Sequence, residues 1–134
     1  MTSRTPRGIR NNNPLNIRIG NTWLGERPNP TDDEFEEFVS MECGLRAAFV
    51  ILKRYIRRYQ RDTIQKIIKS WAPSGENNTT AYIKAVCKTM NLDADQTIKY
   101  EDEDTMCLLV QAMAKVECGV LLPLNQIHKG YKLA

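Results

Sequence analysis

The sequence contains no apolar segment long enough to cross a membrane, and residues 1–13 are polar and basic, with no apolar run. A membrane-spanning helix needs about 20 apolar residues, and a secretory signal needs an apolar stretch of about 7–15 residues. We therefore predict a chain that is synthesised in the cytoplasm without a signal peptide and that has no membrane span.

Histidine and paired cysteines are also scarce. His128 is the only histidine, and none of the four cysteines, Cys43, Cys87, Cys107 and Cys118, forms a Cys-x-x-Cys pair. Zinc sites usually combine several closely spaced cysteine and histidine ligands. We therefore expect no metal site and no organic cofactor. Without an export signal, four scattered cysteines indicate reduced thiols.

The sequence has no strong excess of charge of one sign. Its 19 basic and 16 acidic residues leave a net charge of +3, which suits a polyanionic surface without demanding one. Basic residues cluster over 53–61, on one side of an expected helix. A solvated helix face explains this cluster better than contact with nucleic acid, because no DNA-reading motif accompanies it. No nucleic-acid partner is expected.

The composition is that of an ordinary globular protein. The chain has 134 residues, of which 42% are hydrophobic and 26% charged. This size supports one hydrophobic core, and the sequence shows no repeat and no low-complexity linker. We predict a single domain over residues 1–134, divided into an irregular arm over 1–39 and a helical body over 40–134.

The arm contains turn signals and short alternating patterns. The turn sequence Asn11–Pro14 precedes an alternation of apolar and polar residues over 15–19, which predicts a short strand. A second apolar group, at Phe35, Phe38 and Val39, is compatible with a partner strand. We expect a small β-hairpin near the N-terminus.

From Ser40 onward the apolar residues follow a helical period. We expect the two longest helices near 43–60 and 103–118. The apolar face of the first includes Leu45, Phe49, Leu52, Ile56 and Tyr59, and that of the second includes Leu109, Met113 and Val116. A short helix should follow Asp62, another should follow Asn78 or Thr79, and a last one should span 124–128. The fold class is therefore mainly α.

Four stretches, in order, resemble a known family. Residues 7–18 read RGIRNNNPLNIR, close to the RGIRNNNPGNIR opening of a phage and prophage family described as lysozyme-like or as virion structural proteins. Similar stretches follow at 44–47, 71–82 and 112–119. Two residues depart from the family pattern, Leu15 in place of glycine and Cys118 in place of asparagine. If position 15 required a positive φ, leucine would cost about 1 kcal/mol or more.

The resemblance implies a lysozyme-like domain that cleaves the glycan strand of peptidoglycan, with Glu117 as the catalytic acid. Glu117-Cys118-Gly119 is similar to the Glu-Ser-Gly with which lysozyme-like transglycosylases end a helix. Apolar neighbours and a helix C-terminus both raise the pKa of a carboxyl group, as a general acid needs near neutral pH. The alternative is an ordinary surface residue near a helix end. Glu42 begins a second Glu-Cys-Gly, but it lies at a helix start, where a capping role is favoured.

The motif order differs from that of the transglycosylases. Residues 76–82 resemble a segment that follows the catalytic acid in those enzymes, yet here they precede Glu117. A circular permutation of the lysozyme-like fold would explain this order, because such permutations are tolerated when chain termini lie close together.

A glycan cleft needs amide, charged and aromatic partners. The resemblance and the residue types point to a set of substrate-binding candidates: Asn13, Asn16, Arg18, Trp71, Glu76, Asn78 and Tyr82. Each has a structural alternative, since asparagines cap turns and helices and aromatic residues fill cores. A second carboxylate could come from the acidic stretch over 32–37, although a solvated loop explains most of it better.

Two functions remain open. The first is peptidoglycan cleavage, of the lysozyme or lytic transglycosylase type, at the cell wall after release from the bacterial cytoplasm or from within a virion. The second is a non-catalytic phage or mobile-element protein that uses the same scaffold in a virion or binds the wall, because fold does not determine function. The expected partners are peptidoglycan and, in the second case, virion proteins.

Overall fold

The computed structural model describes residues 5–75 and 77–134, which form six helices. In chain order these are α1 (Arg7–Arg10), α2 (Met41–Tyr59), α3 (Ile64–Trp71), α4 (Thr79–Met90), α5 (Glu103–Cys118) and α6 (Leu124–Leu133). α2 and α5 are the longest of them, as predicted. No helix in the described part of the chain combines the length and apolar character that a membrane span requires.

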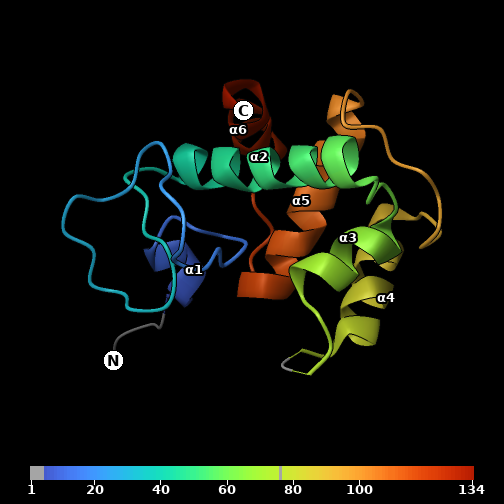
Figure 1. Ribbon diagram of the computed structural model, residues 1–134, viewed down its shortest axis with the longest axis horizontal. Coiled ribbons are helices and arrows are strands. Elements are labelled where there is room, and N and C mark those ends of the chain that lie inside the picture. Colours follow the sequence, from blue (N-terminus) through green and yellow to red (C-terminus); the bar gives the residue numbers. More distant parts are fainter. Residues whose placement is uncertain (1–4, 76) are drawn as a thin grey trace.

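The helices surround one hydrophobic core. α2 packs on α6, α5 packs on both α4 and α6, and α3 packs on α4 (Figure 1). Leu52, Leu109 and Met113 are fully buried in this core, as expected, whereas Ile56 is half-buried and Tyr59 is 48% exposed. The predicted apolar face of α2 was therefore wrong at its C-terminal end. The residues that are buried there are Gly44, Leu45, Ala47, Ala48, Phe49 and Leu52.

Polar caps set most helix boundaries. Ser40, Thr63, Asn78 and Asp102 each accept a backbone N–H bond at the start of α2, α3, α4 and α5, respectively. Thr63 therefore caps α3 in place of the expected Asp62. α6 continues to Leu133, beyond the expected end at residue 128.

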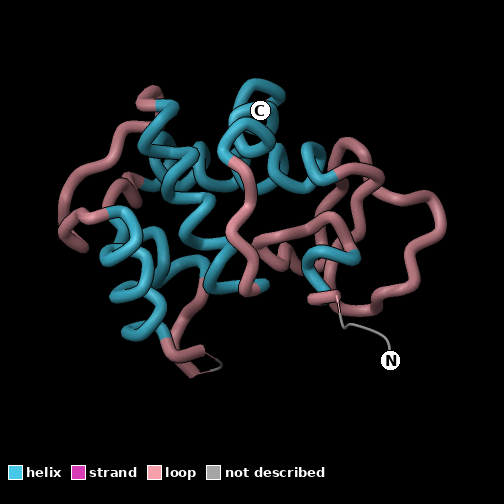
Figure 2. The backbone as a smooth tube through the Cα atoms, turned by 180° about the vertical axis from the view of Figure 1, so that it is seen from behind, coloured by secondary structure: helices cyan, strands magenta, loops and turns pink. Residues whose placement is uncertain are grey.

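Over its described residues, 5–39, the arm is almost entirely loop, apart from the four residues of α1 (Figure 2). The expected β-hairpin is reduced to isolated bridges, Arg18 with Phe35 and Glu26 with Phe38; no regular strand forms in the described residues. Asn13 provides the reason. Its side chain bonds to both the N–H and the C=O of Ile17 and also to the C=O of Glu36, so it takes the place of the ladder bond between the Ile17 N–H and the Glu36 C=O.

In the turn over residues 12–16, the residues with left-handed backbone angles are asparagines. Asn12 and Asn16 adopt left-handed φ angles of 52° and 54°, which asparagine tolerates better than most residues. Leu15 has no positive φ and is fully buried, so the strain considered for leucine at this position does not arise.

The arm lies very close to α2. A Cβ atom added to Gly44 would lie 1.8 Å from the carbonyl oxygen of Asn12, so only glycine fits at this crossing. The arm is therefore docked directly on the helical body, and this contact positions Asn16 and Arg18 beside α5.

Candidate functional site

Glu117 is the penultimate residue of α5, which ends because Gly119 adopts a left-handed φ of 74°. The side chain is half-buried, and both of its carboxylate oxygens accept hydrogen bonds. Asn16 Nδ2 donates to Oε1 at 3.0 Å, and the Tyr82 hydroxyl donates to Oε2 at 3.0 Å. The carboxyl group therefore joins three segments: the arm, α4 and α5.

Burial raises the pKa of Glu117 above the usual range of a glutamate. The hydrogen bonds from Asn16 and Tyr82 oppose this rise, because donors stabilise the charged form. Burial also raises the pKa of Tyr82, with a further contribution from the charge of Glu117, so the phenol keeps its proton and acts as a donor. The arrangement favours a carboxyl group that holds its proton at higher pH than an exposed glutamate does.

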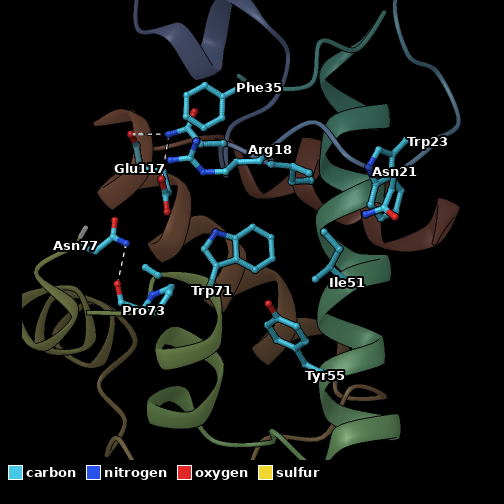
Figure 3. A pocket seen from close by; sticks show the side chains of 13 residues that line it. Arg18, Asn21, Trp23, Phe35, Ile51, Tyr55, Trp71, Pro73, Asn77 and Glu117 are labelled. Atoms are coloured by element: carbon cyan, nitrogen blue, oxygen red, sulfur yellow. Dashed lines mark hydrogen bonds between the residues drawn. The ribbon is translucent and has the colours of Figure 1, made fainter. Parts of the chain in front are cut away.

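A cleft of about 460 Å³ opens beside Glu117. Figure 3 shows Trp71 in the middle of this cleft, with Tyr55 beyond it and Asn21 and Trp23 at the far end from Glu117. The lining residues come from the arm, α2, the end of α3, the loop after α3, and α5. They are Asn16, Ile17, Arg18, Asn21, Trp23, Phe35, Ile51, Tyr55, Trp71, Ala72, Pro73, Asn77 and Glu117.

A second cleft, of about 330 Å³, adjoins the first. Its lining comes from the N-terminal part of α4 and the C-terminal part of α5, and it shares Asn77 and Glu117 with the first cleft. Glu117 thus lies where the two clefts meet. Of the described residues that line the clefts, Glu117 alone carries a carboxyl group.

The structure brings most of the sequence-predicted residues to these clefts. Arg18 and Trp71 line the first cleft, and Asn78 and Tyr82 line the second. Asn16 lines the first and bonds to Glu117. Several of them also have structural roles. The indole N–H of Trp71 donates to the carbonyl of Leu15 at 3.2 Å, and the Asn78 side chain caps α4.

The structure does not place Asn13 where a substrate contact was expected. This asparagine was expected to contact substrate, but it is fully buried and its amide bonds to backbone atoms of Ile17 and Glu36. A side chain in this position has no atom available to a ligand. Glu76, another predicted substrate contact, lies outside the described residues.

Several cleft residues were missed from the sequence. Ile51 and Tyr55 project from α2 beside its buried stripe, and Trp23 and Phe35 come from the arm. Tyr55 and Trp71 form an edge-to-face pair with ring centroids 6.3 Å apart, which gives the cleft an aromatic floor. The one available signal was that Tyr55 follows Ile51 by four positions, so that both lie on the same face of a helix.

The charged groups of the arm form a network near the mouth of the first cleft. Arg18 lies 3.7 Å from a carboxylate oxygen of Glu34 and 5.0 Å from the centroid of the Phe35 ring. Arg7 forms a two-point bond with Asp32, at 2.6 Å for each contact. Arg7 holds the pKa of Asp32 well below its usual range, so this carboxylate stays charged and holds the loop in place.

Two other acidic groups lie away from the clefts. Glu42 is in the first turn of α2 and accepts a bond from Gln126 at 3.4 Å. Glu103 lies with Cys107 and His128 where α5 meets α6, and this cluster could hold a metal ion. The four cysteines are free, as expected.

Protein P5 of Pseudoalteromonas phage PM2 is 36% identical to this chain over 131 residues, which cover 94% of the chain and 80% of that protein. The chain belongs to the Protein P5 family. This relationship confirms the phage affiliation expected from the sequence motifs. No protein-family profile matches the chain. The name Protein P5 states no activity.

Proposed function

We propose that this Protein P5 relative cleaves the glycan strand of peptidoglycan, with Glu117 as the general acid. One observation carries the proposal: a half-buried carboxyl group with a raised pKa lies at the junction of two adjoining clefts. An acid that must protonate a glycosidic oxygen near neutral pH needs such a setting.

The proposed reaction begins with the neutral carboxyl group of Glu117. Its proton passes to the glycosidic oxygen, and the bond from that oxygen to the anomeric carbon breaks. The new carboxylate is stabilised by the donors already bonded to it, Asn16 and Tyr82. It then accepts a proton from the attacking hydroxyl, which belongs to water in a hydrolase or to the sugar itself in a lytic transglycosylase.

Glu117 alone is sufficient for the transglycosylase version of this proposal. Glycosidases that use water as the attacking group generally need two carboxylates. A transglycosylase needs only one acid/base group, because the attacking hydroxyl is already part of the substrate.

The remaining cleft residues would bind the sugars. We assign ring stacking to Trp71 and Tyr55, and hydrogen bonds with N-acetyl groups to Asn77 and Asn78. Arg18 would meet the charged or polar groups of the peptidoglycan at the cleft mouth. Glu76 stays a candidate through the family resemblance alone.

We further propose that the scaffold is a circularly permuted lysozyme-like fold. Residues 77–82 come before Glu117 in the chain, whereas the segment they resemble follows the acid in transglycosylases. Asn77 and Tyr82 nevertheless line a cleft together with Glu117, as a permuted scaffold requires.

A non-catalytic role is the second candidate, as a phage structural protein or a wall-binding protein. The observation that favours it is that both oxygens of Glu117 are already bonded within the protein. A buried carboxylate that only links Asn16 to Tyr82 would show the same contacts. In both candidates the protein would act at the wall after release or as part of a virion.

Digestion of purified peptidoglycan separates the two candidates. The wild-type protein should release muropeptides, and mass analysis would identify anhydro-muramyl ends for transglycosylation or reducing ends for hydrolysis. Glu117→Gln should lose about two to four orders of magnitude in rate. Glu42→Gln is the matched control, because it changes the same type of residue in the other Glu-Cys-Gly and should remain active. Full activity in Glu117→Gln would exclude this acid, and no release by the wild type would favour the non-catalytic role.

The pH profile provides a second test of the same acid. Activity should fall as pH rises through the pKa of Glu117, because only the protonated form can donate. Tyr82→Phe removes one donor from the carboxylate and should raise this pKa further, which moves the alkaline limb of the profile to higher pH. If the alkaline limb lies at the same pH in Tyr82→Phe and in the wild type, the pKa of Glu117 does not determine that limb.

A further inference from the structure

Glu103, Cys107 and His128 bring three possible metal ligands together where α5 packs on α6. Their ligand atoms all lie within 4.8 Å of one another. Glu103 and Cys107 are one turn apart on α5, so they face the same side of that helix, and His128 comes from α6. The cluster is roughly 20 Å along α5 from Glu117, given a rise of about 1.5 Å per residue.

The three ligand types select a particular class of metal ion. Calcium and magnesium prefer sites made only of oxygen atoms. A thiolate, an imidazole and a carboxylate together suit a borderline ion such as Zn²⁺, which all three bind with bonds of about 2.0–2.3 Å. Such bonds place neighbouring ligand atoms about 3–4 Å apart, so the three side chains need only small rotations to surround one ion.

The surroundings of the cluster also suit a bound ion. The Cys107 side chain is buried, whereas the side chains of Glu103 and His128 are about one-third exposed, so the cluster has one side in contact with solvent, from which an ion and a water ligand would come. His128 Nδ1 lies 2.6 Å from Glu103 Oε2, and Nε2 lies 3.7 Å from Asp104 Oδ1. If Nδ1 bound the ion, Asp104 would be placed to hold the other ring nitrogen, as carboxylates commonly do beside metal-bound histidines.

We propose that Glu103, Cys107 and His128 bind one Zn²⁺ ion, which links α5 to α6. The Cys107 thiol would lose its proton to solvent as the Zn–S bond forms. A hydrogen on His128 Nδ1 that bonds to Glu103 would also pass to solvent as the Zn–N bond forms, and the imidazole would keep a hydrogen on Nε2, which faces Asp104. Because the chain regions involved are the start of α5 and the middle of α6, the ion would stabilise the helical body. This site is independent of the glycan cleft and of the function proposed for it.

A cobalt titration tests the proposal directly. Co²⁺ takes the place of Zn²⁺ and reports a thiolate ligand through an intense near-ultraviolet charge-transfer band. The intact, reduced protein should bind one Co²⁺ with this band, and Zn²⁺ should displace it. Cys107→Ser should abolish the band, and His128→Gln, at a partly exposed position, should weaken binding at least tenfold. Cys87→Ser, which alters a half-buried thiol on α4, is the matched control and should behave as wild type.

The outcomes are distinct. A wild-type protein that shows no charge-transfer band, or a band that persists in Cys107→Ser, would overturn the proposal. Circular dichroism of each variant shows whether it is folded, and His128→Gln keeps the test decisive if the buried Cys107→Ser variant unfolds. As a second measure, one equivalent of Zn²⁺ should raise the melting temperature of the wild type and of Cys87→Ser, and it should leave that of His128→Gln unchanged. An equal rise in all three proteins would contradict the assigned ligands.

Discussion

The arm and the helical body are held together by different forces. The body, over residues 40–134, buries most of the hydrophobic core, including the largest apolar side chains of α2, α3 and α5. Among the described residues, the arm contributes only Leu15, Ile17 and Phe38 to the buried hydrophobic residues. It contains, however, four of the six buried polar residues among those described, namely Asn11, Asn13, Glu36 and Glu37.

This difference has a consequence for the candidate site. Hydrophobic burial tolerates small displacements, whereas hydrogen bonds to buried polar groups depend on distance and angle. Asn16 and Arg18 belong to the arm, and Glu117 belongs to the body. The relative positions of the site residues therefore depend on polar contacts, while the stability of the fold that holds them depends on the core of the body.

The largest effect is expected in the core of the body. Leu109→Ala should lower the free energy of unfolding by about 2–5 kcal/mol, because Leu109 is fully buried in α5 and its truncation leaves a cavity. Urea denaturation followed by circular dichroism measures this change. The neighbouring Leu108 is 40% exposed, so Leu108→Ala should lower the free energy of unfolding much less. Equal losses in both variants would contradict the assigned core.

Gly44→Ala should separate the arm from the body. The new Cβ would overlap the Asn12 carbonyl, which should cost about 1–3 kcal/mol although alanine is the better helix former. Hydrogen exchange should show faster exchange of the Phe38 amide, which bonds to the Asn11 carbonyl, and unchanged protection in α5. Arg54→Ala, on the exposed side of the same helix, is the control. A stabilised Gly44→Ala protein would disprove the close crossing.

The stability of the arm should depend on pH in both directions. Arg7 lowers the pKa of Asp32, so this stabilisation is complete above about pH 4 and is lost as pH falls further. Burial, with a contribution from Glu26, raises the pKa of Glu36 to about 7, so its stabilisation is complete below about pH 4 and is lost as pH rises through about 7.

The Glu36→Gln variant isolates the second of these effects. Wild-type protein should lose stability between pH 5 and pH 8, and Glu36→Gln should lose less over the same range, because it removes the titrating group. Urea midpoints at the two pH values measure the difference. If the two proteins respond equally, Glu36 does not titrate in this range.

The smallest effect is expected from an ion pair on the body. Arg57 bonds to Glu101, but both side chains are more than half exposed, so Arg57→Gln should change stability by no more than about 0.5 kcal/mol. The related change in the arm, Arg7→Gln, removes the charged partner of the Asp32 carboxylate, whose side chain is 7% exposed, and should lower stability more than Arg57→Gln does. Similar values for the two variants would remove the distinction between arm and body.

The helical body was largely predictable from the sequence. The apolar period, the polar cap at Asp102 and the glycine at Gly119 together define α5, and a similar pattern defines most of α2. α6 was predicted to span only 124–128, whereas it continues to Leu133. Gly130 lies inside α6, where a Cβ atom would come within 2.5 Å of Leu45. Only tertiary packing explains that glycine.

The arm and the site were less predictable. An alternating pattern predicted strands over 15–19 and around Phe38, but the side chain of Asn13 inserts between the N–H of Ile17 and the C=O of Glu36. The pairing of residues 17–19 with 34–36 is therefore limited to two backbone bonds, from Glu36 to Ile17 and from Ile19 to Glu34. The local pattern placed Glu117 at a helix end beside apolar residues. The approach of Asn16 and Tyr82 to its carboxyl group depends on contacts between distant segments, which no local pattern contains.

The hydrogen bond between Asn16 and Glu117 joins residues that are 101 positions apart in the chain. The amide at residue 16 and the carboxyl group at residue 117 can therefore meet only after the segments between them have been synthesised and packed. The lining of the first cleft likewise comes from the arm, α2, the end of α3 and α5. A proteolytic cut that releases the arm would therefore remove one wall of the cleft while leaving the core of the helical body in place.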